Sequence, residues 1–540
     1  MTVVREGAAD RAAAPAYDRL DWALAGLIGL AALAAYVRTL APDLLYGDSA
    51  EFQTLAYTLG ITHSTGYPVY LLLARGLGFL PLGTQAWRVT LLSAVGGAVA
   101  VAGVYLWARR LTEDRIGPLL GSLVLAVSTT FWTQSILAEV YTPALAFIVV
   151  AMLLLFHWSA QPMGRPWYLA GAALLLGAGL GVHASVGLFI PPAAAFALWR
   201  LWDPALDRRE RLRGLRVGLG SGLGGVALFV GTFLLLDAID PPSSFINTAL
   251  IPSRSVWGLS REALARPWTR FWVTVTGLQW QTAMFADGWA GMQRALGDYW
   301  TRLVTREFTR FTVGFALVGA AAMLRAPRAG HERRRVGSFT LGAYLFVLAL
   351  LLNYRPGDWH VFLLPAHLLL AVAAGVGMGQ ALRAVRGFGV GRVAEITLVV
   401  VLLVLLLAPA AMPRWDALAD GRAHFSEEDY VYPVYNPDEP RSAATLRVAL
   451  LPDRAMVLLE WRMLYAVTYM AHVEGHRPGL IPIEATPYGS EGRVAASLVT
   501  LIEETLAAGI PVYTDQLYEP LGDHFGSRRA IAGTMVQLLP

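Results

Sequence analysis

Acidic and basic side chains recur at the ends of the apolar stretches of this chain, where they could transfer protons or bind a charged ligand. The first group lies in YGDSAEFQTLAYTLGITHSTGYP, residues 46–68, which contains Asp48, Glu51 and His63 between two long apolar segments. A positioned carboxylate can accept the proton of a hydroxyl group, which is the role of a general base. Because ionisable side chains near a bilayer are costly unless they have a function, these positions are candidates for an active site.

A second group of ionisable residues is predicted at the same membrane face. Glu139 lies in FWTQSILAEVYTPALAF, one turn into an apolar segment, where a snorkelling surface acid is the alternative interpretation. His183, in GLGVHASVG, is more often a hydrogen-bonded packing residue than a ligand contact. Arg355 and Asp358 lie in NYRPGDWHVFLLPAH, which also fits a short solvated loop. Together with the first group, however, these residues map to one face, as an active site at the bilayer surface would require.

Asp48 and Glu51 also have a purely structural interpretation. The order DSAE fits a capping box, in which Asp48 caps a helix and Glu51 reaches back to the cap amide. The two interpretations are compatible, because a capping carboxylate remains an ionised acceptor that can face a cavity.

The composition indicates an integral membrane protein. Of the 540 residues, 56% are hydrophobic and only 15% are charged, which is too much apolar surface for one soluble core. The chain has no cysteine, which excludes disulfides and cysteine metal sites, and its 43 basic residues are all arginine, which excludes a Walker or Schiff-base lysine. The net charge of +4 does not indicate nucleic-acid binding, since arginines in a membrane protein mostly mark the cytoplasmic side.

Apolar runs of about 17–25 residues predict an α-helical polytopic membrane protein with about eleven transmembrane helices. The expected spans are residues 22–40, 88–108, 116–132, 136–158, 168–183, 185–200, 217–236, 307–324, 337–352, 361–382 and 393–411. Short arginine-rich loops fall on one side under this count, which predicts a multi-pass protein of the inner (plasma) membrane with a cytoplasmic N-terminus. Residues 41–87, 237–306 and 413–540 then face outward.

The first outer piece carries its candidate residues on two short helices. Residues 48–59 and 67–79 each have apolar side chains on one helical face, which predicts two interfacial helices between the first and second spans. The second outer piece, residues 237–306, is rich in tryptophan, which suits a membrane interface and could also line a groove for an isoprenoid chain.

Residues 413–540 have short apolar segments in place of long apolar runs. This pattern predicts a separate extracytoplasmic domain beside a transmembrane domain of residues 1–412. The segments AMVLLEW, GLIPIEA, IPVYTD and MVQLLP predict four short strands, and RVAASLVTLIEETLAAG predicts an amphipathic helix. Alternation of strands and helices favours a small α/β domain with a parallel sheet. No G-x-G-x-x-G or P-loop is present, so no nucleotide site is expected.

The chain resembles the GT-C membrane glycosyltransferases, and within them the bacterial relatives of the protein O-mannosyltransferases. The resemblance rests on GDSAEFQTLAYTLGITHSTGYPVYLLLARGLGFLPLG, RVTLLSAVGGAVAVAGVYLWARRLT and FWTQSILAEVYTPALAF, and covers roughly residues 22–410. The family usually has a proline pair after the histidine, where this chain has Ser64 and Thr65.

The resemblance implies an enzyme that moves a sugar from a polyprenyl-phosphate donor to an acceptor hydroxyl at the outer membrane face. It implies that Asp48 is the general base, with Glu51 and Glu139 positioning the acceptor. An acceptor hydroxyl is a poor nucleophile, so a carboxylate must take its proton, and direct attack inverts the configuration at the sugar carbon. The sugar, and whether the acceptor is a protein, a lipid or a glycan, stay open.

The departing lipid phosphate needs positive charge around it, which arginine supplies through its planar fork. Arg254, in IPSRSVWG, and Arg355 are the candidates for this contact, and either could equally be a solvated loop arginine. The other residues expected to bind substrate are His63, Tyr67, His183 and Asp358.

Two alternatives concern the function and one the cofactor. A polyprenyl-phosphate transporter or flippase, or a non-catalytic lipid-binding membrane protein, would need the arginines but not the base. Some GT-C enzymes hold a divalent cation between outer-loop acids, and Asp48, Glu139 and His63 could supply ligands. The protein O-mannosyltransferase branch works without one, so no metal and no other cofactor is expected.

Overall fold

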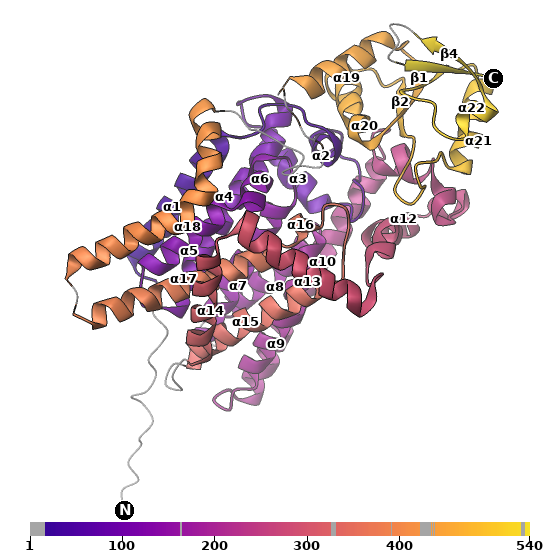
Figure 1. The fold of residues 1–540 in the computed structure, drawn as a ribbon. Coiled ribbons are helices and arrows are strands. Elements are labelled where there is room, and N and C mark those ends of the chain that lie inside the picture. Colours follow the sequence, from indigo (N-terminus) through magenta and orange to yellow (C-terminus); the bar gives the residue numbers. More distant parts are fainter. Residues whose placement is uncertain are drawn as a thin grey trace, which may run out of the picture.

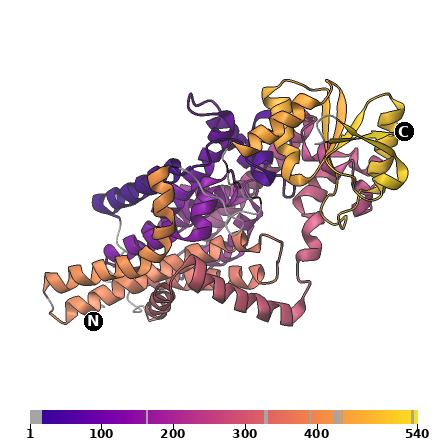
Figure 2. The same cartoon turned by 45° about the horizontal axis from the view of Figure 1, so that its top comes forward.

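The computed structural model describes residues 17–161, 165–325, 331–389, 391–421, 432, 434, 436, 438–530 and 535–540. Most of these residues are helical, and a small sheet lies at one end of the helical bundle in both views (Figures 1 and 2). Arg5 and Arg11 of the N-terminal tail lie outside the described residues.

Seven helices of the described residues are long and apolar enough to cross a membrane. They are α1 (Arg19–Arg38), α4 (Gln85–Leu111), α7 (Tyr141–Ala160), Ala184–Leu201, which comprises η1 (Ala184–Phe189) and α9 (Ile190–Leu201), α10 (Arg208–Ile239), α15 (His331–Leu351) and α17 (Leu364–Gly387). Two bent pairs raise the count to nine: α5 (Ile116–Val127) with α6 (Thr129–Ile136), at 64°, and Gly288–Glu307 with α14 (Arg310–Leu324), at 114°. The chain is therefore a multi-pass membrane protein.

The predicted count of about eleven differs from these seven to nine spans for identifiable reasons. The predicted span 168–183 is α8 (Pro166–Gly179), which is only 14 residues long. The predicted span 116–132 breaks at Ser128, where α6 turns away from α5. A further helix, α18 (Arg392–Asp420), covers the predicted span 393–411 and continues past the predicted domain boundary at residue 412.

Glycines bring α14 and α17 into close contact. A Cβ atom added at Gly319 would lie 1.9 Å from the carbonyl oxygen of Ala373, and one added at Gly377 would lie 1.8 Å from that of Phe315. Such small residues let helix backbones pack directly where lipid supplies no hydrophobic drive between them.

The first outer piece forms α2 (Gly47–Thr58), which begins one residue before the predicted range 48–59, and α3 (Pro68–Leu77), which lies within the predicted range 67–79. Most of α2 is buried, because a helix of the C-terminal domain packs on it. The predicted capping box is wrong. The residue before α2 is Tyr46, without a side-chain cap, and the Glu51 carboxylate bonds to His63 instead.

The second outer piece is a chain of short helices that ends in a longer one. It forms η2 (Ile246–Leu250), η3 (Arg254–Trp257), α11 (Arg261–Leu264), α12 (Pro267–Val275), η4 (Leu278–Ala283), α13 (Gly288–Arg302) and η5 (Leu303–Glu307). A later short helix, α16 (Trp359–Phe362), joins α15 to α17.

The C-terminal domain has a five-stranded mixed sheet in the order β2-β1-β3-β5-β4. Its elements are α19 (Glu439–Leu450), β1 (Ala455–Leu459), α20 (Trp461–Thr468), η7 (Tyr469–Glu474), β2 (Leu480–Glu484), α21 (Ala496–Ala507), β3 (Val512–Thr514), α22 (Leu521–His524), β4 (Gly526–Ala530) and β5 (Met535–Leu539). The first three strands in this order are parallel, as predicted, whereas β5 and the unpredicted β4 pair antiparallel.

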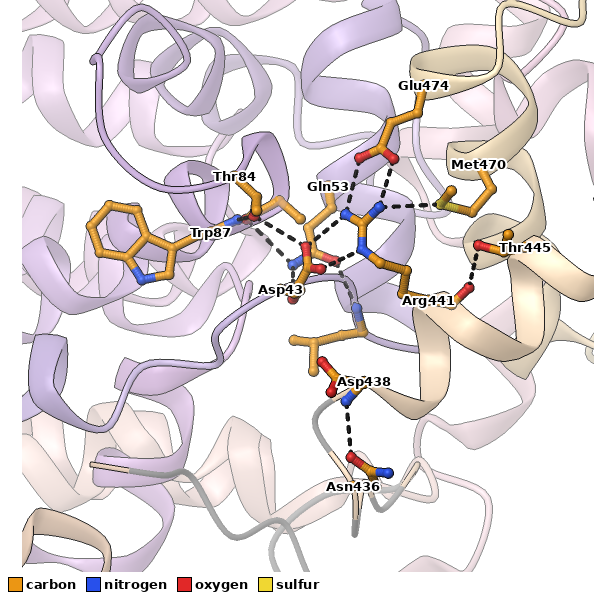
Figure 3. A network of polar contacts seen from close by, with 12 residues as sticks. Asp43, Gln53, Thr84, Trp87, Asn436, Asp438, Arg441, Thr445, Met470 and Glu474 are labelled. Atoms are coloured by element: carbon orange, nitrogen blue, oxygen red, sulfur yellow. Dashed lines mark hydrogen bonds and ion pairs between the residues drawn. The ribbon is translucent and has the colours of Figure 1, made fainter. Parts of the chain in front are cut away.

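Two contacts fasten this domain to the membrane part. The α20 residues Leu464 and Tyr465 belong to the same hydrophobic core as Phe52 of α2. Arg441 of α19 bridges two acids from different regions: its Nη2 donates to Asp43 of the first outer piece at 2.8 Å and its Nη1 to Glu474 at 2.6 Å (Figure 3). The position of the sheet relative to the bundle is therefore held by both apolar and ionic contacts.

Candidate active site

A cavity of about 480 Å³ lies where the membrane part meets the C-terminal domain. Its walls come from α2 and the segment before α3, the break between α6 and α7, η4, α16 and the C-terminal domain. The ionisable lining residues other than tyrosine are Asp48, His63, Glu139, Asp358, His360 and Glu484. Aromatic rings make up much of the remaining wall: Tyr67, Tyr141, Phe245, Trp280, Tyr354, Phe362, Tyr432, Trp461 and Tyr488.

Asp48 lies in the first turn of α2 and is held from the C-terminal domain. Nε1 of Trp461 donates a hydrogen bond of 2.6 Å to Oδ1 of Asp48. The other carboxylate oxygen, Oδ2, lies 3.8 Å from Nε2 of His63, and the Asp48 side chain is 36% exposed. One oxygen is therefore fixed while the carboxylate stays accessible from the cavity.

Glu51 and His63 form a buried pair behind Asp48. Glu51 lies one turn further along α2, its Oε2 is 2.5 Å from Nδ1 of His63, and its Oε1 accepts a 2.8 Å hydrogen bond from the His63 amide. Burial alone would lower the pKa of His63, but the Glu51 and Asp48 carboxylates outweigh it and raise that pKa to about 9. His63 is thus an imidazolium at neutral pH and places a positive charge beside Asp48.

Glu139 and Asp358 also line the cavity. Glu139 lies in the break before α7, where its backbone exchanges hydrogen bonds of 2.8 and 3.0 Å with the Ser93 hydroxyl. Burial, together with Asp48, raises the pKa of Glu139 well above its usual value. Asp358 precedes α16 and accepts a 3.4 Å hydrogen bond from Tyr141, and burial and the Asp48 charge raise its pKa to about 6. These carboxyl groups gain protons more readily than free carboxylates.

Tyr67 lines the cavity, and His183 packs against the Tyr67 ring without lining the cavity itself. The Tyr67 hydroxyl donates a 2.7 Å hydrogen bond to the Ser64 carbonyl, and its ring stacks on His183 with centroids 5.7 Å apart. Nδ1 of His183 lies 2.8 Å from the Ser185 hydroxyl, and burial lowers the pKa of His183 to about 3. These contacts fit the alternative interpretation of His183 as a hydrogen-bonded packing residue, and its substrate contact stays a prediction.

The two arginines predicted to bind phosphate do not reach the cavity. Arg254 lies in η3 and donates a 3.0 Å hydrogen bond to the Ile251 carbonyl. Arg355 pairs with Asp298 at 2.8 Å and lies over the Trp359 ring, 5.0 Å from its centroid. The Arg254 guanidinium thus bonds within its own segment and the Arg355 guanidinium pairs with α13, and neither side chain lines the cavity. Among the described residues that line the cavity there is no arginine.

Two residues of the C-terminal domain were missed in the sequence. Trp461 and Glu484 both line the cavity, at the start of α20 and at the end of β2. Each stands at the carboxyl end of a predicted strand, in AMVLLEW and GLIPIEA, which is where α/β sheets usually bind ligands. That rule was the available signal, but nothing in the sequence placed the sheet edge over Asp48.

The predicted acids and His63 do not form a metal site in the described part of the chain, where no three His, Asp or Glu side chains converge closely enough to hold an ion. Asp48 and His63 lie together, and Glu139 shares the cavity with them.

Comparison with known proteins finds sequence relatives for part of the N-terminal half of the chain. A family model described as the N-terminal domain of protein O-mannosyl-transferase TMEM260 matches residues 48–205. Mouse protein O-mannosyl-transferase TMEM260 is 31% identical over 217 residues, which are 39% of this chain and 31% of the mouse protein. The Dictyostelium discoideum protein of that name is 26% identical over 122 residues, 22% of this chain and 15% of that protein. The chain thus matches less than a third of the length of either relative.

Nearly the whole chain is similar in fold to a solved structure. The crystal structure of ArnT from Cupriavidus metallidurans bound to undecaprenyl phosphate is 13% identical and covers 96% of this chain and 98% of its own, with a TM-score of 0.52. The predicted GT-C-like fold is therefore confirmed, and so is the resemblance to the protein O-mannosyltransferases over the segment that carries Asp48, His63 and Glu139. Both curated relatives are eukaryotic, and the bacterial part of the prediction stays a prediction.

Proposed function

We propose that this chain is an inverting glycosyltransferase that moves a sugar from a polyprenyl-phosphate donor to an acceptor hydroxyl. The observation that carries the proposal is the Asp48 carboxylate, which faces the cavity with one oxygen fixed by Trp461. The names of the mouse and Dictyostelium relatives suggest mannose as the sugar and a protein hydroxyl as the acceptor. The undecaprenyl phosphate named for the ArnT structure suggests the class of lipid carrier.

In this proposal Asp48 takes the proton of the acceptor hydroxyl as the oxygen attacks the anomeric carbon. The bond from that carbon to the lipid phosphate breaks on the opposite side, and the configuration inverts. The phosphate leaves as an anion, so no acid needs to protonate it, but nearby positive charge lowers the barrier. Of the described lining residues, His63 alone carries such a charge at neutral pH, and Glu51 keeps it there. Glu139 and Asp358 contact the acceptor or the sugar hydroxyls.

The test is transfer and donor binding by wild type and Asp48→Asn in the same detergent. The probes are a radiolabelled mannosyl phosphate polyprenol and a serine- and threonine-containing peptide. The variant should lose about 10²- to 10⁴-fold in transfer rate and keep its donor affinity, since a base acts only as the transition state forms. A lipid flippase or binding protein predicts donor binding without transfer by the wild type. An Asp48→Asn variant with more than about half the wild-type rate would remove Asp48 as the base.

We further propose that the cavity opens on the extracytoplasmic side of the inner membrane, with the N-terminus in the cytoplasm. The arginine-rich loops support this orientation through the positive-inside rule. Reporter tags after Arg110, Arg209 and Arg334 should therefore report cytoplasm, and one after Asp420 the outside. A cytoplasmic tag after Asp420 would contradict the orientation.

A further inference from the structure

Three acidic residues stand at the carboxyl ends of the parallel strands of the C-terminal sheet, where ligands usually bind in such sheets. Glu460 follows β1, Glu484 ends β2, and Asp515 follows β3. The carboxylates of two of these residues already accept hydrogen bonds from side chains of the same domain. The Glu460 carboxylate accepts a 2.7 Å hydrogen bond from Gln516, and the Asp515 carboxylate accepts one of 2.6 Å from Tyr518.

Glu484 differs from these two acids in its surroundings. It is 5% exposed and lines the cavity, yet its carboxyl group has no hydrogen-bond or ion-pair partner among the described residues. Its backbone is fixed, because β2 pairs with β1 and the Ala485 amide donates a 2.9 Å hydrogen bond to the Leu459 carbonyl. Burying an unpaired carboxyl costs free energy, which a ligand that bonds to it would offset.

The wall that carries Glu484 is formed by the C-terminal domain. A donor anchored in the bilayer reaches the site from the membrane part, whereas the C-terminal domain lies beyond one end of the helical bundle (Figure 2). Thr486, Pro487 and Tyr488 continue the same wall, and Tyr488 meets Trp280 of η4 with ring centroids 4.2 Å apart. In the proposed orientation, a peptide that arrives from the water side therefore meets this wall of the C-terminal domain rather than the membrane part.

The charge of the cavity selects among acceptors. Its described lining holds four carboxyl groups, those of Asp48, Glu139, Asp358 and Glu484, and no arginine. Because Glu484 and Glu139 have raised pKa values and take up protons readily, it is mainly the Asp48 carboxylate that would repel an acidic group in this poorly hydrated space.

We propose that Glu484 is an acceptor-binding residue, whose carboxyl group hydrogen-bonds the peptide next to the hydroxyl that Asp48 deprotonates, and that the acceptor class is a hydroxylated segment without acidic neighbours. This rests on the proposed transferase function. Burial and the nearby Glu51 raise the pKa of Glu484 to about 8, so at neutral pH the group carries a proton and can both donate to and accept from a peptide amide.

The experiment measures transfer by the full chain from mannosyl phosphate polyprenol to a neutral threonine peptide at varied peptide concentration, and release of free mannose to water without peptide. The variants are Glu484→Ala and Glu484→Gln, with Glu460→Gln as the matched control at the end of the neighbouring strand. Glu484→Ala should raise the peptide KM about tenfold or more, with donor KM and mannose release within about twofold of wild type. Glu484→Gln should fall between, because an amide keeps part of the hydrogen bonding. Glu460→Gln should match the wild type.

An active wild type whose peptide KM is unchanged by Glu484→Ala would overturn the acceptor role alone. So would an equal loss of mannose release and transfer in both Glu484 variants, which indicates a structural role. A wild type that neither transfers nor releases mannose would overturn the transferase function and this role with it.

The acceptor class is tested with a second peptide. The wild type should transfer mannose about tenfold less well to a peptide with aspartate on both sides of the threonine than to the neutral peptide. Equal transfer rates to the two peptides would contradict the proposed preference for acceptors without acidic neighbours.

Discussion

Asp43 and Asp48 lie five residues apart in the first outer piece, and each is held by a helix of the C-terminal domain, but by different chemistry. Arg441 of α19 bonds to both oxygens of Asp43 and also to Glu474 (Figure 3). Trp461 of α20 bonds to one oxygen of Asp48 and brings no charge. An arginine that pairs with a carboxylate neutralises it and occupies its lone pairs, whereas an indole fixes the group and leaves it able to accept a proton. The difference separates an acid that holds two domains together from one suited to catalysis.

The largest expected effect separates the two aspartates directly. Asp48→Asn should lower the transfer rate by about 10²- to 10⁴-fold with thermal stability close to wild type, because Asp48 caps no helix and asparagine can still accept the Trp461 hydrogen bond. Asp43→Asn should lower stability and leave more than about a tenth of the rate. The measurements are the transfer rate and the unfolding temperature of both variants. Equal losses of transfer rate would contradict the assignment of a catalytic role to Asp48 and a structural role to Asp43.

Trp461→Phe tests how the C-terminal domain holds the base. Phenylalanine keeps a ring that can pack edge to face against His63 and Tyr465 but removes the indole N–H. A hydrogen bond to a charged group contributes about 1.5–3 kcal/mol, so the transfer rate should fall about 10- to 100-fold while donor affinity is kept. The measurement is kcat and donor KM. A rate like that of wild type would mean that Asp48 needs no orientation from this bond.

Arg441→Met should act mainly on stability. The change leaves Asp43 and Glu474 without their shared cation, at a cost of about 1–3 kcal/mol in the free energy of unfolding. Activity should fall less than about tenfold, since the apolar contact between α2 and α20 remains. Denaturant unfolding checks this against Arg447→Met, a control on the same helix whose arginine, among the described residues, donates a hydrogen bond to the Ala443 carbonyl alone. Similar unfolding of the two variants would show that the network contributes nothing.

The smallest effect concerns pH. The folded pKa of His63 is about 9, above its usual value, so its pairing with Glu51 stabilises the fold fully below about pH 6.5, and this contribution is lost as pH rises through 9. The stability difference between wild type and His63→Gln should therefore shrink from pH 6.5 to 10. The corresponding difference for Arg441→Met should stay constant, because arginine keeps its charge. Thermal unfolding across this range tests both, and a constant His63 difference would contradict the assigned charge.

The sequence predicted the membrane class, the GT-C-like fold, the positions of α2 and α3 and the meeting of Asp48, His63, Glu139 and Asp358. These predictions rest on apolar run lengths and short motifs, which are local properties of the chain. The roles of Arg254 and Arg355 could not be predicted in this way, since Arg355 turns to Asp298, 57 residues away. Trp461 and Glu484 depend in turn on the docking of a whole domain, which periodicity does not encode.

The Asp48 to Trp461 hydrogen bond joins residues 413 positions apart in the chain. A ribosome that adds about 5–20 residues per second therefore completes Trp461 about 20–80 s after Asp48. Throughout this interval the nascent polypeptide can insert its early helices while the carboxylate lacks its indole partner and the cavity lacks one wall. The order of synthesis thus delays a complete site until the last part of the chain has folded against the first.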